Sequence, residues 1–201
     1  TLLTTPIAAS DGDIGRVGDL LVEDDTHAIR WIVADTGGWM AAHETLLPPV
    51  ACRPDDSLGR LNTDLTSEQV RTCPPASADR PVGRAYEKML FEHYRIGPYW
   101  RLAPGGGMLP PPAPTDAGMP GHEEAERAEA VHLRSVRELL GYRIEATDDT
   151  AGHIADLVFD ADDWHLRFVV GNTRNWLPGG RDVVLAPDWF EHFDYLGKRG
   201  I

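Results

Sequence analysis

Short apolar segments separated by acidic turns are found near both ends of the chain. Residues 16–24, RVGDLLVED, form an apolar segment that ends in acidic residues, and residues 28–36, AIRWIVADT, are rich in β-branched and aromatic side chains. Such side chains fit the pleated surface of a sheet. Asp side chains in the turn between the segments bond to nearby backbone N–H groups. The pattern predicts a β-hairpin.

The same pattern returns 137 residues further along the chain, when Gly15 is aligned with Gly152. At this constant offset identical residues match without a gap: Ala9/Ala146, Asp11/Asp148, Asp19/Asp156, Leu20/Leu157, Asp25/Asp162, Arg30/Arg167, Val33/Val170, Thr36/Thr173 and Trp39/Trp176. A register of this length indicates two copies of one module.

Strands this short, with no helices between them, predict a small antiparallel barrel or sandwich. Closing the sheet would also remove exposed strand edges. The predicted fold class is therefore mainly β with short helices, with two small antiparallel β-barrels in tandem. The first barrel and its helical extension cover residues 1–102, and the second covers residues 131–201. Pro and Gly dominate residues 103–130, which predicts an exposed linker.

The two copies differ at their flanks. Residues 135–146, SVRELLGYRIEA, give copy two a short helix that runs into a strand. Copy one starts at Thr1, opposite Glu138, so we expect its helical lead to be shortened. Copy one instead has an extension, in which LTSEQVRTCPP predicts a brief helix that proline ends.

A second helix is predicted over residues 82–96. Tyr86, Met89, Leu90 and Tyr94 recur there at helical spacing and form an apolar face. We expect this face to pack on a barrel, with the helix at an interface between modules or between subunits. Because two-fold dimers are the commonest oligomers, a homodimer is expected.

The charge restricts the classes of partner. The chain carries 32 acidic against 19 basic side chains, a formal net charge of −13. Nucleic-acid binding draws on Lys and Arg that neutralise phosphates, so no nucleic-acid partner is expected, and a basic protein fits better. No apolar run is long enough for a membrane span. The two cysteines, Cys52 and Cys73, lack metal-site spacing and are expected to be reduced thiols in a cytoplasmic protein.

No motif in the sequence supports catalysis. The acidic turns, EDDTH and DADDWH, lack the Gly and terminal Glu of a calcium loop, so solvated hairpin turns are favoured over cation sites. The histidines show no paired metal spacing, and the serines lack a nucleophile elbow. We therefore expect a protein that is not an enzyme and has no metal or cofactor.

Four aromatic residues remain as candidate interaction residues, together with the apolar face of the predicted helix. Trp39 and Trp176 stand at matching places beside a turn in the two copies, and Tyr99 and Trp100 end the first module. Trp is enriched at binding hot spots. Packing over the barrel mouth is the favoured alternative for Trp39 and Trp176. For Tyr99 and Trp100 the favoured alternative is a structural role, in which they dock the helix or bridge to the second module.

The stretch from residue 11 to 39, DGDIGRVGDLLVEDDTHAIRWIVADTGGW, together with the second copy ending NTRNWLPGGRDVVLAPDWF, resembles the PRC-barrel domain. That domain occurs in the photosynthetic reaction centre H subunit and in the ribosome maturation protein RimM. LTSEQV and FEHYRIGPYW look like the tail that follows the barrel in tandem bacterial members. The resemblance implies a small β-barrel that serves as an interaction or assembly module without enzymatic activity.

Two functional classes follow from these observations. One is a non-catalytic module that binds a protein partner, with a role like that of the reaction centre H subunit suggested by resemblance alone. The alternative is a regulatory module that binds a small ligand or a metal.

Overall fold

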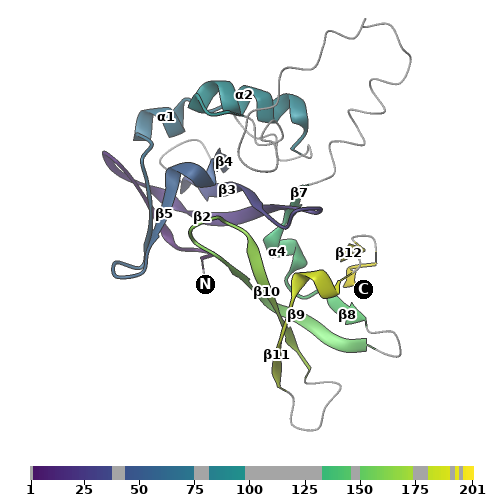
Figure 1. The fold of residues 1–201 in the computed structure, drawn as a ribbon. Helices are drawn as coiled ribbons and strands as arrows, with labels where there is room; N and C mark the ends of the chain where they lie inside the picture. Colours follow the sequence, from purple (N-terminus) through teal and green to yellow (C-terminus); the bar gives the residue numbers. More distant parts are fainter. Residues whose placement is uncertain are drawn as a thin grey trace, which may run out of the picture.

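The computed structural model describes residues 2–37, 44–74, 82–97, 133–145, 150–173, 181–190, 193–194 and 197–201. The strands form two sheets, each built mainly from one copy of the repeat (Figure 1). The first sheet has the strand order β4-β3-β2-β1-β6-β5, and β7 pairs with β2. The second has the order β11-β10-β9-β8-β13-β12, which is the same order strand for strand.

The sheets are built from short strands and from one long strand each. The first contains β1 (Pro6–Ala9), β2 (Gly12–Glu23), β3 (Ile29–Asp35), β4 (Glu44–Leu47), β5 (Cys52–Asp55), β6 (Arg60–Thr63) and β7 (Leu133–Ser135). The second contains β8 (Arg143–Glu145), β9 (Thr150–Phe159), β10 (Leu166–Asn172), β11 (Asp182–Leu185), β12 (Phe193–Asp194) and β13 (Arg199–Gly200). β3 and β10 occupy equivalent residues in the two copies, so the repeat in sequence is a repeat in structure.

The helices are short. They are α1 (Ser67–Arg71), α2 (Arg84–Tyr94), α4 (Val136–Leu139) and the 3₁₀ turns η2 (Pro49–Ala51) and η4 (Pro187–Trp189). Thr66 caps α1 in a capping box with Gln69. Arg95 ends α2 in the left-handed conformation. Helix α2 therefore confirms the helix predicted over residues 82–96.

The prediction of a mainly β fold with short helices is confirmed. The prediction that each sheet closes into an antiparallel barrel is wrong. Each sheet is mixed, because β1 pairs in parallel with β6 and β8 pairs in parallel with β13. Among the described residues no ladder joins the edge strands β4 and β5. These edges are connected through Pro48 and Pro49, and proline has no N–H to donate to a ladder.

The two hairpin turns meet at the contact between the modules. Ala28 and His165 form an isolated antiparallel bridge. Ile29 donates its backbone N–H to the Trp164 carbonyl at 2.8 Å, and Leu166 donates to the His27 carbonyl at 2.9 Å. Ile29 and Leu166 are equivalent residues of the repeat, as are His27 and Trp164, so the two hydrogen bonds are related by the repeat. This reciprocity is the mark of a two-fold relation, so the modules meet as a pseudo-dimer.

A continuous apolar core spans both modules. From the first it takes Ile7, Leu20, Trp31, Ile32, Leu47, Leu61 and Leu90, and from the second Leu139, Tyr142, Ile154, Leu157 and Val169. None of the helices in the described ranges has the length and apolar character needed to cross a bilayer.

Candidate functional site

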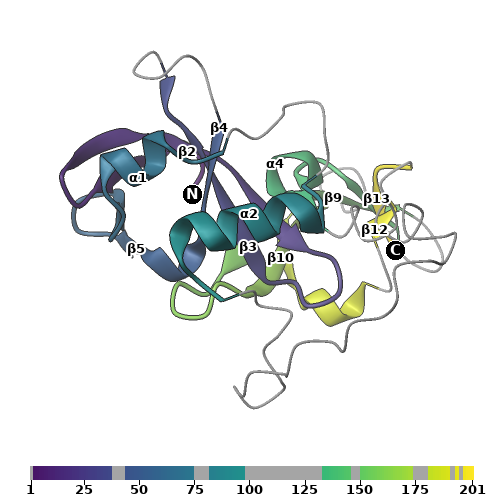
Figure 2. The same cartoon turned by 90° about the horizontal axis from the view of Figure 1, so that it is seen from above.

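One face of the first sheet is covered by α2. This covered face consists of Trp31 and Val33 of β3 and their cross-strand partners Leu21 and Leu46. Helix α2 lies across β3, on the side of the sheet away from the second module (Figures 1 and 2). Trp31 retains only 1% of its accessible surface.

Three contacts fix α2 on the covered face. The Trp31 indole Nε1 donates to Glu87 Oε1 at 2.8 Å within the core. The Phe91 ring lies 5.3 Å from the Trp31 ring, centroid to centroid. The Tyr94 hydroxyl donates to the Leu46 carbonyl at 2.8 Å. Residues at positions 87, 91 and 94 share one side of a helix, so spacing along α2 delivers all three contacts to the same face.

The equivalent face of the second sheet is open. This open face consists of Phe168 and Val170 of β10 and their cross-strand partners Val158 and Val184. Phe168 is 46% exposed, Val158 42% and Val184 61%. In the repeat Phe168 stands where Trp31 stands. The same four positions are therefore apolar in both copies, but a helix covers only one set of them.

The exposure of the open face follows from strand alternation. Val169 pairs with Leu157 and with Leu185, and these three side chains form the inner row of the sheet. Val169 and Leu157 are buried. Residues next to an inward side chain point outward, which places Phe168 and Val170 on the other side. Exposed apolar side chains that cluster in this way are typical of interaction surfaces.

The acidic hairpin turns are held by arginines. In copy one the Arg30 guanidinium binds the Glu23 carboxylate, and in copy two the Arg167 guanidinium binds Asp160 at 3.2 Å and also Asp163. The backbone N–H of Asp162 and the Arg167 guanidinium lower the pKa of Asp160. The described residues contain no group of three or more His, Cys, Asp or Glu side chains arranged to hold a metal ion.

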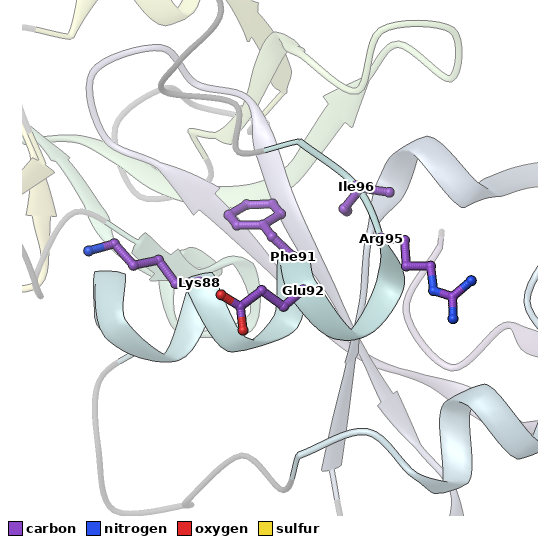
Figure 3. A pocket seen from close by; sticks show the side chains of 5 residues that line it. All are labelled: Lys88, Phe91, Glu92, Arg95 and Ile96. Atoms are coloured by element: carbon purple, nitrogen blue, oxygen red, sulfur yellow. The ribbon is translucent and has the colours of Figure 1, made fainter. Parts of the chain in front are cut away.

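A shallow pocket of about 330 Å³ lies beside the end of α2. It is lined by Lys88, Phe91, Glu92, Arg95 and Ile96. Figure 3 shows that the Lys88 and Arg95 side chains extend away from each other, on either side of Phe91 and Ile96. A small-ligand site needs a few polar groups that converge on the ligand. This arrangement does not provide them.

Four of the eight predicted interaction residues lie in the described part of the chain. Leu90 and Tyr94 are buried on the sheet of their own module, Tyr86 is partly buried, and Met89 is exposed. The apolar face of the helix thus packs on its own sheet and does not face the second module. Trp39, Trp176, Tyr99 and Trp100 lie outside the described residues. A role in partner binding stays a prediction for all eight.

The open face was missed by the sequence analysis, although the repeat contained a signal for it. A sheet with one solvated face alternates apolar and polar residues. Val158, Phe168 and Val184 break that alternation, as their counterparts do in copy one. In copy one the amphipathic segment over residues 84–94 covers the outer row.

Both cysteines are free thiols inside the first module. Cys52 and Cys73 are buried. Burial raises the pKa of Cys52 to about 12 and also raises the pKa of Cys73. Because thiols react as thiolates, neither group is set up as a nucleophile.

We expect Cys52 and Cys73 to resist iodoacetamide at pH 8 in the folded protein, since each thiol is buried and protonated. In guanidinium chloride both should be alkylated. Unfolded thiols ionise near pH 9.0 while the folded Cys52 stays protonated, so the free energy of unfolding should fall as the pH rises above that value. Mass spectrometry of alkylation against time checks the first result. Rapid labelling under native conditions would contradict it.

Comparison with protein-family models gives no match. A protein of Deinococcus radiodurans, described only as an uncharacterized protein, is 39% identical to this chain over 85 residues. The similar region covers 40% of this chain and 31% of that protein, so the chain spans less than a third of its relative's length. Neither comparison bears on the resemblance to the PRC-barrel domain.

Proposed function

We propose that the chain is a non-catalytic interaction module that binds a protein partner through the open face of its second sheet. The observation that carries the proposal is the pair of equivalent faces. Helix α2 covers one of them and leaves Trp31 1% exposed, while Phe168 at the equivalent position is 46% exposed. The first module thus provides a precedent for how such a face is buried.

The chemistry of the partner follows from the open face and from the charge of the chain. The face offers four apolar side chains, so the partner contributes apolar groups at the centre of the contact. A net charge of −13 favours basic residues at its rim. The resemblance to the PRC-barrel domain supports an assembly role of this kind, which we place in the cytoplasm. A function like that of the reaction centre H subunit is the specific form that the resemblance suggests.

The double variant Phe168→Asp/Val184→Asp tests this function. Placing two carboxylates on the open face should reduce recovery of the bound partner from a lysate of the source organism at least about tenfold, because charged groups are disfavoured at interface centres. Leu58→Asp is the matched control, since Leu58 in the β5–β6 turn is 61% exposed, as Val184 is. Quantitative pull-down with each purified protein gives the measurement.

The melting temperature of both variants should stay near that of the wild type, because the substituted side chains are exposed. Equal recovery of the same partner by the double variant would overturn the proposal. Light scattering of the same proteins shows whether the partner is a second copy, as the predicted homodimer requires. A melting temperature that shifts with a chelator or with one member of a metabolite panel would favour the ligand-binding alternative.

A further inference from the structure

The first module already binds an extended segment along the edge of β2. Strand β7 pairs with residues Leu21–Glu23 in antiparallel register. The Asp19 carboxylate holds the same segment, because it accepts from the Ser135 hydroxyl and, at 2.9 Å, from the Arg137 backbone N–H. The Arg137 guanidinium also donates to the Gly18 carbonyl. Asp19 thus recognises both the strand and the start of α4.

The equivalent edge of β9 is unpaired within the described part of the chain. Strand β9 pairs with β8 only as far as Gly152 and His153, and Ile154 then exchanges hydrogen bonds with Gly141 and Tyr142. No described strand pairs with the remainder of this edge.

Backbone groups of Phe159 face this edge. Asp160 donates its N–H to the His165 carbonyl at 2.9 Å, across the hairpin toward β10. Backbone groups alternate sides along a strand, so the N–H and C=O of Phe159 point the other way. Val22 is the equivalent residue in the first module, and it pairs with Arg134 of β7.

A carboxylate at this edge corresponds to the one that holds β7 in the first module. Asp156 is the counterpart of Asp19, and its Oδ1 accepts from the Leu157 N–H at 2.8 Å just as Asp19 accepts from Leu20. Asp156 is exposed and makes no hydrogen bond to another side chain among the described residues. One difference between the two edges is that Ala161 replaces Asp24, the carboxylate that binds Arg134 in the first module.

We propose that the edge of β9 beyond Ile154 binds an extended segment of a partner polypeptide by strand addition. The segment has a Ser and a following Arg spaced as in LRSVR, residues 133–137. The Ser hydroxyl and the backbone N–H two residues later bind Asp156, the Arg side chain binds the Ala155 carbonyl, and the strand pairs with Phe159. The proposal rests on the proposed interaction function and extends it from the open face to the neighbouring edge.

Two observations favour a basic partner segment at this edge. Residues 133–137 of this molecule are already docked on β2, so a different segment must occupy the edge of β9. Carboxylates also surround the edge, with Asp156 on one side of Phe159 and with Asp160 and Asp162 on the other. Peptides that add a strand gain affinity from main-chain hydrogen bonds and specificity from alternate side chains. Here the specificity comes from Asp156.

Amide hydrogen exchange tests the edge directly. In the wild type we expect the Phe159 amide to exchange at least about tenfold faster than the Val22 amide, because only Val22 has a strand beside it. A tethered probe then supplies the segment. The pentapeptide LRSVR is joined ahead of Thr1, the point that the repeat places opposite Glu138, and the tether raises its effective concentration. The Phe159 amide should slow at least about tenfold, and the melting temperature should rise.

The matched control carries the same pentapeptide with both arginines replaced by glutamate. It should leave the Phe159 amide fast, and Asp156→Ala in the LRSVR chain should reverse the protection. Equal exchange at Phe159 in the LRSVR and control chains would overturn the proposal. Because Phe168 and Val184 are unchanged in these chains, failure here is distinguishable from failure of the open face.

Discussion

Replacing Trp31 by alanine is expected to lower the free energy of unfolding by about 3–5 kcal/mol, the usual range for truncating a large buried aromatic side chain. The indole is 1% exposed between β3 and α2. Its loss also leaves the buried Glu87 carboxylate without the indole N–H, which donates at 2.8 Å. Guanidinium denaturation followed by circular dichroism measures the change.

The repeat supplies the control for this experiment. Phe168 occupies the position of Trp31 in the second module but is 46% exposed. We expect Phe168→Ala to cost less than about 1 kcal/mol, because exposed side chains bury little surface that a truncation could remove. Similar losses for the two variants would show that α2 does not stabilise the first module in the way described.

Much of the fold could be predicted from the repeat. Residues 28–36 and their counterparts predict a strand in each copy, and β3 and β10 lie there. The pairing between the first strand of each module and a strand near its end could not be predicted. The parallel ladder between β1 and β6 joins Ile7 to Leu61, and alternation of apolar side chains is the same in parallel and antiparallel pairs. The sequence pattern therefore did not show that each sheet stays open.

The burial of the side chains of α2 could also be predicted only in part from the sequence. Leu90 and Tyr94 were predicted to form an apolar helix face, and both are buried. Met89 was assigned to the same face but points to solvent, whereas Glu87, a charged residue, is fully buried against Trp31. A polar residue inside the core is specified by its partner, which lies 56 residues away. A pattern read from neighbouring residues could not supply that contact.

The repeat contains a glycine in each copy at a position that does not tolerate a side chain. Gly15 has φ of +140° and its counterpart Gly152 has φ of +134°. A Cβ at Gly15 would lie 2.1 Å from the Asp35 carbonyl oxygen, and one at Gly152 would lie 2.2 Å from that of Asn172. In both modules the long strand approaches the backbone at the end of the next strand so closely that no side chain fits.

We expect Gly15→Ala to lower the free energy of unfolding by more than about 3 kcal/mol, since it combines left-handed strain with a clash against backbone. Gly12→Ala is the control, because Gly12 also has positive φ, +155°, but its Cβ would meet nothing within 4 Å. Strain alone should cost that variant about 1–2 kcal/mol. Guanidinium denaturation of both proteins separates the two contributions. If Gly15→Ala were no less stable than Gly12→Ala, the close approach between β2 and the end of β3 would not be what requires glycine at this position.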